Sequence, residues 1–504
     1  MPQDRASRLS AYLRQLGGRD PHVGAAAYYA SVDQVAAVSP TVADAIVEEL
    51  RAQRSNLKLI ASENYCSLAT QLAQGNLLTD KYAEGVAGKR FYAGCDNVDA
   101  VEREACDLAR QLFQADHAYV QPHSGVDANL TALFAILFAK VRAPFLDRLA
   151  ARRPEDVSRE DWLRLGQEMG RQRLLGMDYY SGGHLTHGYR LNAVSHVLDC
   201  YSYTVDPETH RLDMNALWRQ VREIRPLILL AGYSAYPRRI DFAALRQMAD
   251  EVGAVLWVDM AHFAGLVAGG VFQGDYDPVT HADIVTTTTH KTLRGPRGGL
   301  VLCRQPYAEW VDKGCPTNLG GPLPHVMAAK AVAFREALRP EFRDYAHQVV
   351  NNSRALAEEC LARKLPVLTG GSDNHLVLVD VWKSFGLTGR QAESALRSCG
   401  LTVNRNALPF DPQGAWFTSG LRLGTAAAAT LGMGTQEMRE IADVVSLVLA
   451  NARPAEGAEG ASRGKVMVDS RVAEQARNRV GSLLARHPLY PEIDLDILSG
   501  GLPT

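Results

Sequence analysis

The sequence predicts an α/β protein with a parallel or mixed sheet in a large domain and a smaller α+β unit toward the C-terminal end. Between residues 56 and 335, short apolar runs alternate with Gly-rich or polar turns and helical patterns. Continuous apolar runs of this kind are typical of strands that helices cover on both faces. Past residue 340, a long helical segment leads into alternating strand patterns and a final helix. The length of 504 residues is ample for both units.

Composition narrows the class of protein, because 54 Lys and Arg residues against 56 Asp and Glu residues give a formal net charge of −2. This balance argues against a protein that mainly binds nucleic acid or a membrane surface. The eight cysteines include no C-x-x-C pair, so we expect neither a disulfide scaffold nor a structural zinc site. The N-terminus lacks the apolar run of a signal peptide, and the longest apolar stretch, 130–139, is too short to span a bilayer. We therefore expect a cytoplasmic protein.

The expected elements follow in order along the chain. Residues 1–55 are an N-terminal helical arm in which Val42, Ile46 and Leu50 recur at four-residue spacing. Residues 56–335 are the large domain. Its apolar runs, interpreted as strands, are 226–236, 253–262, 282–291 and 298–303, and a helical pattern covers 241–252. Residues 336–504 are the smaller unit, with strands expected in 375–382 and 401–407.

Two segments look like additions to this plan. Residues 140–175 are dense in charges of both signs, and Trp162, Leu163 and Leu165 supply a modest apolar face. We therefore expect a surface pair of helices there. Residues 453–463 have the composition of a linker.

The sharpest chemical signal is a run of threonines, 286–289, that leads into His290 and Lys291. A lone lysine after a strand is usually a solvated surface residue. Ligands, however, gather at the carboxyl edge of an α/β sheet. Arg294 and Arg297 follow closely in the sequence, and positive neighbours lower the pKa of a lysine toward the free amine that a Schiff base requires.

A second signal is Asp259, which follows the apolar strand 254–258 and precedes His262. The usual interpretation of such an aspartate is a structural cap. Next to a Schiff-base lysine it has another use, because a carboxylate keeps the ring nitrogen of pyridoxal phosphate protonated and the ring can then accept electrons. Aspartate and lysine on successive strands fit that requirement.

Other segments offer an anion site and further ligands. Ser124 and Gly125 precede a helical run, where free N–H groups and the helix dipole favour a phosphate. His184 and His187 are three residues apart, a spacing that suits either a metal ion or a ring that stacks on a flat cofactor. Without an H-E-x-x-H motif we expect no metal.

Two further segments carry groups suited to a substrate. The loops at 62–67 and 78–94 combine Ser62, Glu63, Tyr82, Glu84 and Tyr92 with glycines, and acid–base chemistry is often carried by loops on a rigid scaffold. Their alternative interpretation is ordinary turns. In the segment 419–425, Arg422 stands between glycines and could grip a carboxylate by two hydrogen bonds, the alternative being a surface ion pair.

These segments, in this order, carry a resemblance to a known family. LIASENY, LTDKYAEG, GKRFYAGC, QPHSG, GGHLTHG, VDMAHFAGLVA, VTTTTHKTLRGPRGG, GGPL, SDNHL and TSGLRLGT together resemble serine hydroxymethyltransferases from about residue 40 to residue 491. The resemblance implies the fold type I of pyridoxal-phosphate enzymes, with a mostly parallel seven-stranded sheet in the large domain. It also implies pyridoxal 5'-phosphate as cofactor and tetrahydrofolate as co-substrate.

The resemblance implies a role for each matched residue. Lys291 corresponds to the Schiff-base lysine, Asp259 to the partner of the pyridine nitrogen, and His184 to the histidine stacked on the ring. The other implied cofactor contacts are Ser124, Gly125, Ser234, His262 and His290, with Tyr82 and Gly321 from the neighbouring subunit. The implied substrate contacts are Ser62, Tyr82, Glu84, Tyr92, Arg297 and Arg422, together with Tyr179, Gly183, Leu185 and Asn406 on the folate side. Glu84 corresponds to the acid–base carboxylate that crosses the dimer interface, and Thr288 joins the catalytic set.

The chain departs from the family pattern at a few places. Val126 stands where a hydroxyl residue usually follows Ser-Gly, and Phe91 replaces one of two tyrosines. The approach to GGPL reads CPTNLGG, the folate-side loop carries residues 414–416, Gly-Ala-Trp, and the insert precedes His184. None of these departures removes the expected acid, base or Schiff-base residue.

The resemblance predicts reversible transfer of a hydroxymethyl carbon from L-serine to tetrahydrofolate, which gives glycine and 5,10-methylenetetrahydrofolate. Sites shared between chains imply at least a homodimer, and a tetramer stays open. One alternative is a folate-independent aldolase, which needs the same Lys291, Asp259 and Arg422. The other is a binding protein without activity, which would be expected to have lost Lys291, Asp259 or Glu84; all three are present.

Overall fold

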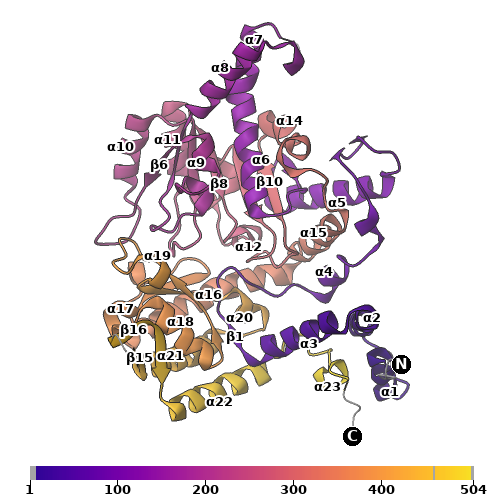
Figure 1. The fold of residues 1–504 in the computed structure, drawn as a ribbon, viewed down its shortest axis with the longest axis vertical. Helices are drawn as coiled ribbons and strands as arrows, with labels where there is room; N and C mark the ends of the chain where they lie inside the picture. The colour runs from indigo at the N-terminus through magenta and orange to yellow at the C-terminus, as the bar shows by residue number, and fades with distance from the viewer. Residues whose placement is uncertain (1–6, 152, 458–459, 501–504) are drawn as a thin grey trace.

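The computed structural model describes residues 7–151, 153–457 and 460–500 and shows a large domain above a smaller one (Figure 1). A seven-stranded sheet forms the centre of the large domain, as the resemblance implied. Its strands, in spatial order, are β4 (His117–Tyr119), β10 (Gly299–Cys303), β9 (Ile284–Thr288), β8 (Val255–Asp259), β7 (Ile228–Gly232), β5 (Arg173–Met177) and β6 (Asp199–Tyr203). β10 pairs antiparallel with both neighbours, whereas β9, β8, β7, β5 and β6 pair in parallel.

Helices cover both faces of this sheet, and the strand sequences show why. Successive side chains in a strand point to opposite faces. In β8, Leu256 and Val258 accordingly join one apolar core, while Val255 and Trp257 join another. The first core includes residues of α5 (Asp96–Phe113), α11 (Phe242–Val252) and α15 (Pro324–Ala337), and the second includes α6 (Gly125–Leu137). The predicted strands and the helix in 241–252 are confirmed.

The smaller domain has its own core and a three-stranded sheet in the order β11-β14-β13. The strands are β11 (Leu376–Asp380), β13 (Asn404–Asn406) and β14 (Gly420–Gly424), and the main helices are α16 (Pro340–Ala362), α18 (Gly389–Ser398) and α21 (Thr435–Ala450). The strand expected over 375–382 ends early, because the Asp380 side chain accepts the N–H of Lys383 and begins α17 (Val381–Phe385). β1 (Leu57–Lys58) pairs in parallel with β12 (Leu401–Thr402), and Leu57 packs in the core of the smaller domain.

The linker expected at 453–463 is wrong. β15 (Ala452–Gly457) and β16 (Gly460–Val468) form an antiparallel hairpin, of which residues 458–459 lie outside the described part. Thr388 Oγ1 donates to the Arg463 carbonyl at 2.8 Å, and Gln391 Nε2 donates to the Lys465 carbonyl at 3.2 Å. Hydrogen bonds from α18 thus hold a segment whose composition alone indicated flexibility.

The predicted insert contains α7 (Ala143–Arg148) and α8 (Arg159–Gly170), which project from the top of the molecule in Figure 1. Its expected apolar face is wrong in part, because Trp162 is 46% exposed and Leu163 is 60% exposed, whereas Leu165 is buried. Residues 173–175 belong to β5. A continuous helical run, Gly125–Arg148, is long and apolar enough to cross a membrane by length and composition. Half of its apolar window is buried, and α6 packs against β9 and β10.

The N-terminal arm consists of α1 (Arg8–Leu16), α2 (Val23–Val38) and α3 (Pro40–Ser55), and residues 1–6 lie outside the described part. The face predicted for α3 is wrong at Val42, which is 50% exposed; the buried residues are Ala43, Val47 and Leu50. This arm shares a core with α23 (Leu495–Leu498) near the C-terminus. Arg54, at the end of α3, holds this arm to the segment before α23 by donating to the carbonyls of Leu489, Tyr490 and Ile493.

Further α-helices and strands lie between these elements. They are α4 (Leu68–Leu72), β2 (Gly85–Val86), β3 (Lys89–Arg90), α9 (Val194–Val197), α10 (Met214–Ile224), α12 (Ala264–Ala268), α13 (Pro278–His281), α14 (Ala308–Val311), α19 (Gly414–Phe417), α20 (Ala426–Thr430) and α22 (Ser470–Arg486).

Candidate active site

A cleft of about 580 Å³ lies where the two domains meet. It opens at the carboxyl ends of β5, β7, β8 and β9, the edge at which α/β sheets bind ligands. Ten predicted site residues line it: Ser62, Tyr179, Gly183, His184, Leu185, Ser234, His262, Lys291, Asn406 and Arg422. The rest of its lining is Ala235, Glu393, Asn404, Arg405, Ala407, Ala415 and Thr418. Residues from both domains therefore meet in one cavity.

Lys291 lies at the floor of this cleft, just beyond the end of β9. Burial lowers the pKa of its amine to about 8; the Asp259 carboxylate opposes this shift, and Arg422 and Arg297 add to it. The interpretation as a solvated surface lysine is therefore wrong. A desolvated amine with this pKa is in part unprotonated near neutral pH, which is the form that attacks an aldehyde.

Asp259 is held by groups that the sequence did not reveal. Its Oδ2 accepts a hydrogen bond from Asn129 Nδ2 at 2.9 Å and lies 3.2 Å from His187 Nε2, while its Oδ1 accepts the N–H of Ala261 at 3.0 Å. Burial alone would raise the pKa of this carboxyl, but its interactions with His187, His184 and Asn129 hold the pKa well below its usual range. Asp259 therefore both caps a turn and keeps its negative charge.

Asn129 and His187 were missed as partners of Asp259. Asn129 lies one helical turn beyond Gly125 on α6, and this spacing from the expected phosphate loop was the available signal. The spacing of His187 from His184 indicated only a metal ligand or a stacking ring. Ligand atoms of His184, His187 and Asp259 do lie within 4.8 Å of one another, a geometry that a metal ion could use.

His184 and His262 approach the cleft as neutral rings. His184 Nδ1 lies 2.8 Å from Thr186 Oγ1, and burial lowers the pKa of His184 to about 4. His262 Nδ1 lies 3.1 Å from Nε2 of His375, a residue of the smaller domain that was also missed. Burial lowers the pKa of His375 to about 3, with Arg422 and Lys291 adding to the effect, and lowers the pKa of His262 well below its usual range. These side chains thus join the two domains without charge.

The buried imidazoles predict acid sensitivity of the cofactor-free protein. Unfolding lets His375 take up a proton near pH 6.5, whereas in the folded protein it does so only near pH 3. Its contribution to stability is complete above pH 6.5 and is lost as the pH falls below that value. We expect the free energy of unfolding to fall between pH 6.5 and pH 5 by about 1.5 kcal/mol more in the parent protein than in His375→Gln.

Urea denaturation at the two pH values measures this difference. The same substitution at exposed His196 controls for the loss of an imidazole. Equal pH dependence in the parent protein and His375→Gln would contradict the assignment.

The predicted phosphate loop is built as a helix N-terminus. Ser124 Oγ accepts the N–H of Asp127 at 3.2 Å and caps α6. A side chain at Gly125 would place its Cβ 2.7 Å from Thr288 Cγ2, so glycine permits the close approach of this loop to β9. Thr288 Oγ1 donates to the Ala261 carbonyl at 3.1 Å, which supports the same edge. Burial lowers the pKa of His290 to about 3, and its buried Nδ1 has no hydrogen-bond partner in the described chain.

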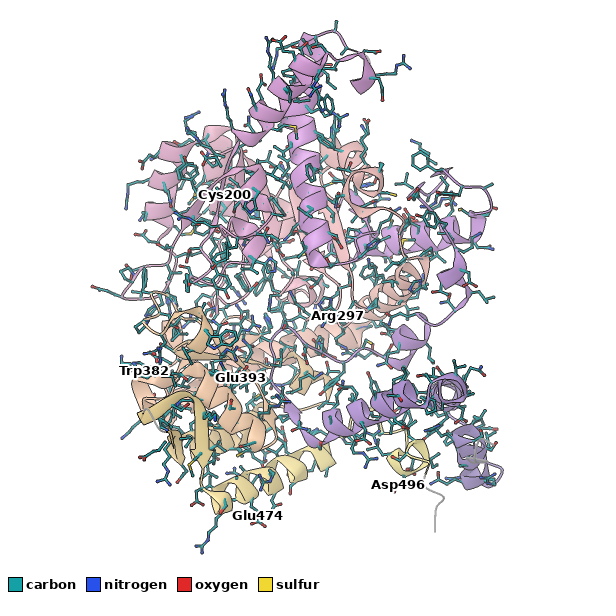
Figure 2. The ribbon with its side chains drawn as sticks, in the orientation of Figure 1. Cys200, Arg297, Trp382, Glu393, Glu474 and Asp496 are labelled. Atoms are coloured by element: carbon teal, nitrogen blue, oxygen red, sulfur yellow. The ribbon has the colours of Figure 1, made fainter. Side chains whose placement is uncertain are left out.

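Arg422 points its guanidinium into the cleft from β14. Its Nη1 donates to the Ser234 carbonyl at 2.6 Å and its Nε to Asn404 Oδ1 at 3.1 Å. Burial lowers the pKa of Arg422 to about 10. Within the described residues no carboxylate pairs with it, so the surface ion pair is wrong. Arg297, labelled in Figure 2, is exposed, and its Nη1 lies 3.5 Å from His290 Nε2.

Four predicted residues form a second group apart from the cleft lining. The Tyr82 and Tyr92 rings meet edge to face at 5.0 Å, a Cβ at Gly321 would lie 3.5 Å from the Tyr82 ring, and Glu84 raises the pKa of Tyr82. The segment between α4 and α5 that carries most of them lies at the right edge of Figure 1, away from α19 at the cleft. The described chain therefore does not bring Glu84 to its own Lys291.

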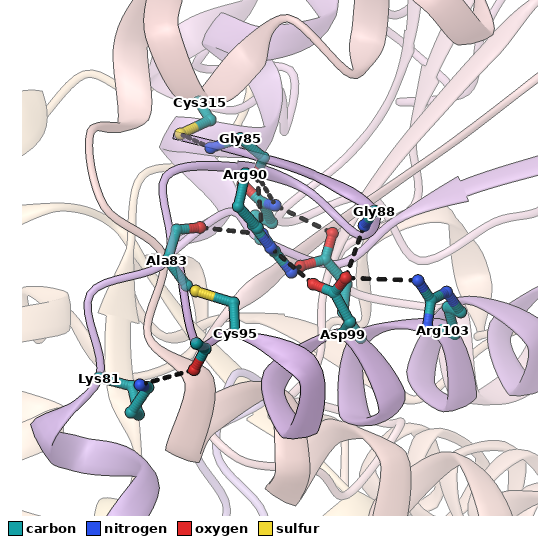
Figure 3. A network of polar contacts seen from close by, with 12 residues as sticks. Lys81, Ala83, Gly85, Gly88, Arg90, Cys95, Asp99, Arg103 and Cys315 are labelled. Carbon is teal, nitrogen blue, oxygen red and sulfur yellow. Dashed lines mark hydrogen bonds and ion pairs between the residues drawn. The ribbon is translucent and has the colours of Figure 1, made fainter. Parts of the chain in front are cut away.

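Buried polar contacts fix the backbone on both sides of Glu84 (Figure 3). Arg90 Nη1 donates to the carbonyls of Ala83 and Gly85 at 2.8 and 2.9 Å, and Arg90 Nε donates to Asp99 at 2.8 Å. Cys315 Sγ accepts the N–H of Gly85 at 3.3 Å. This support presents Tyr82 and Glu84 from a rigid segment.

Comparison with known proteins agrees with this arrangement. The sequence model of the family described as serine hydroxymethyltransferase matches residues 35–147 and 168–445. The gap in this match falls in the projecting α7–α8 region. The chain is 56% identical over 489 residues to the serine hydroxymethyltransferase of Treponema pallidum, covering 97% of this chain and 85% of that protein.

Two further relatives carry the same name. Identity is 55% over 470 residues with the protein of Salinispora tropica, covering 93% of this chain and 98% of the relative. It is 53% over 495 residues with that of Mycolicibacterium smegmatis, covering 98% and 100%. Because the family model covers most of the chain and these relatives are more than 50% identical to it, the chain belongs to the serine hydroxymethyltransferase family.

Proposed function

We propose that the cleft between the domains performs the reaction of this pyridoxal-phosphate enzyme family, the reversible conversion of L-serine and tetrahydrofolate to glycine and 5,10-methylenetetrahydrofolate. The observation that carries the proposal is that Lys291 from the large domain and Arg422 from the small domain line one cleft, with the Asp259 carboxylate close enough to act on the Lys291 amine. A buried amine, a charged carboxylate beside it and a guanidinium with no carboxylate partner among the described residues suit a cofactor aldehyde, a protonated ring nitrogen and an amino-acid carboxylate, respectively.

The residues in and beside the cleft fit pyridoxal phosphate. Gly125 begins α6, where backbone N–H groups favour an anion, and a Cβ there would lie 2.7 Å from Thr288 Cγ2, so only glycine fits. The Nδ1 of His290, which has no hydrogen-bond partner among the described residues, is a further group for the anion. We propose that Ser124, Gly125, Ser234 and His290 hold the phosphate end, Asp259, His184 and His262 hold the ring, and Lys291 forms the covalent bond. When bound, the cofactor supplies an electron sink for the pair released as the Cα–Cβ bond breaks.

The chain's own groups bind the reactants and handle the protons. Arg422 and Ser62 hold the serine carboxylate, which orients the Cα–Cβ bond. Tyr179, Gly183, Leu185 and Asn406 line the folate side of the cleft. Glu84 takes or returns the proton of the serine hydroxyl. Thr288 and Arg297 support these groups from β9 and its following loop, and Tyr92 supports Tyr82.

We propose that Glu84 acts in the cleft of a partner subunit, so the enzyme is at least a homodimer. Exposed aromatic side chains support this, since Tyr82 is 58%, Phe91 71% and Tyr92 45% exposed in the single chain. The eight free cysteines suit a cytoplasmic location. We propose a division into an arm (1–55), a large domain (56–335) and a small domain (336–504); separate cores support these three units, with Leu57 and Leu59 packing in the small domain's core.

Spectra and turnover test this function. The purified protein should show a visible absorption band from bound cofactor, and glycine plus tetrahydrofolate should change that band. Serine cleavage should depend on tetrahydrofolate. A colourless protein that takes up no pyridoxal phosphate would overturn the proposal, and equal serine cleavage with and without folate would favour the aldolase alternative.

Arg422→Lys tests the carboxylate site. Lysine keeps the charge but loses the paired donors, and a hydrogen bond to a charged group contributes about 1.5–3 kcal/mol. We expect the KM for serine to rise by about 10- to 100-fold with the cofactor band retained. The same substitution at Arg405, another cleft residue, is the matched control, and an unchanged KM in Arg422→Lys would contradict the role.

A further inference from the structure

Lys330 is a fully buried lysine outside the cleft, on α15, with 1% of its surface exposed. Its Nζ donates to three backbone carbonyls, those of Val120 at 2.6 Å, Pro122 at 2.9 Å and Gly299 at 2.8 Å. An ammonium group has three N–H donors and no acceptor, so three carbonyls satisfy it completely. Burying such a charge is costly unless it is bonded in this way. The structure thus uses a buried lysine to fix the backbone at three carbonyl groups.

The three carbonyls belong to the two segments that build the expected phosphate site. Val120 and Pro122 lie between β4 and Ser124, which caps α6. Gly299 begins β10 and ends the loop that starts with His290 and Lys291. The Gly299 N–H also donates to the Pro122 carbonyl at 2.9 Å. Lys330 therefore holds the two segments together through hydrogen bonds to the backbone of both.

The geometry of the backbone couples these hydrogen bonds to the orientation of the expected phosphate site. Because the peptide unit is planar, fixing the Pro122 carbonyl also fixes the direction of the next N–H, that of His123. The packing leaves little freedom: a Cβ at Gly299 would lie 2.2 Å from the Ser124 carbonyl oxygen, and a Cβ at Gly298 would lie 2.5 Å from Lys330 Cε. A shift of the Lys330 side chain must therefore move the loop that contains Gly298 and Gly299.

We propose that Lys330 is a positioning residue for the cofactor phosphate, since its three hydrogen bonds hold the 120–125 loop against the 289–299 loop. This inference rests on the proposed function and names a residue that touches neither the cofactor nor the substrate. It predicts a defect confined to recognition of the phosphate group.

The test compares binding of pyridoxal 5'-phosphate with binding of pyridoxal, which has the same aldehyde and ring but no phosphate. Each is titrated into cofactor-free protein and followed by absorption. In Lys330→Gln we expect the dissociation constant for pyridoxal phosphate to rise about 10-fold or more, with less than about a 3-fold change for pyridoxal. Gly298→Ala, which displaces the lysine without removing its charge, should shift the same ratio in the same direction.

Leu356→Ala, in the fully buried core of the small domain, is the control for general destabilisation and should leave the ratio unchanged. An unchanged ratio in Lys330→Gln, or an equal loss for both ligands, overturns the proposal. If Lys330→Gln does not fold, Gly298→Ala decides by the same ratio. A parent protein that binds both ligands equally overturns the proposed function as well, which separates the two failures.

Discussion

Lys291→Ala should abolish both the visible absorption band and turnover of serine. Alanine removes the only amine that the described residues place at the cleft floor, so the covalent bond to the cofactor cannot form. Removing a covalent nucleophile costs on the order of 10⁴- to 10⁶-fold in kcat, and we expect a loss on that scale. The measurement is the spectrum of the purified variant beside a steady-state assay.

Lys291→Arg is the matched control because it keeps the positive charge and lacks a nucleophilic amine. It should lose the band as well, whereas a role limited to charge would preserve binding and activity in arginine. Retention of the parent band in Lys291→Ala would place the covalent link elsewhere. Circular dichroism of both variants separates this result from unfolding.

The sheet and the central pair Lys291 and Asp259 could be predicted because both follow from local sequence. A buried strand is a continuous apolar run, and the polar residues that follow such runs meet at one edge when the strands are parallel. The register confirms this, since Asp259 pairs with Thr286 on the neighbouring strand. The resemblance then supplied roles that residue types alone left open.

The supporting residues could not be predicted in the same way. Asn129, His187, His375 and Lys330 act through partners distant in sequence, and each residue type has common structural uses that give no chemical signal by itself. The hydrogen bond from Asn129 to Asp259 exists only because α6 crosses the sheet beside β8. Lys330 is buried because α15 packs against the 120–125 and 289–299 loops.

Two errors in the fold have different physical causes. Four-residue spacing places Val42, Ile46 and Leu50 progressively around a helix with 3.6 residues per turn. The buried face therefore follows spacings of four and three, through Ala43, Val47 and Leu50. The hairpin at β15 and β16 has weak apolar content, and hydrogen bonds from Thr388 and Gln391 stabilise it. Tertiary contacts thus overrode local composition.

The position of Glu84 bears on two features of the single chain, the lining of the cleft and the exposed aromatic side chains. The cleft contains a nucleophilic amine and a carboxylate site, but Glu84 does not line it. Glu84 stands instead on a braced segment beside exposed aromatic rings. The proposed homodimer accounts for both facts, because a symmetric dimer can exchange these segments between two clefts.

Glu84→Gln should bind serine nearly as well as the parent protein and turn it over far more slowly. Glutamine keeps the shape of the side chain but does not exchange a proton, and acid–base assistance contributes typically about 10²- to 10⁴-fold. We expect kcat to fall by that factor, with the KM for serine changed less than about 3-fold. Steady-state kinetics with tetrahydrofolate measures both, and comparable turnover would contradict the role.

A mixed dimer of Glu84→Gln and Lys291→Ala tests where Glu84 acts. If the two groups come from different chains, one of its two sites contains both defects and the other is intact, so the purified mixed dimer should recover about half of the parent activity. If each site uses its own chain's Glu84, both sites carry a defect and no activity returns. Differently tagged chains, expressed together and purified by both tags, make this comparison decisive.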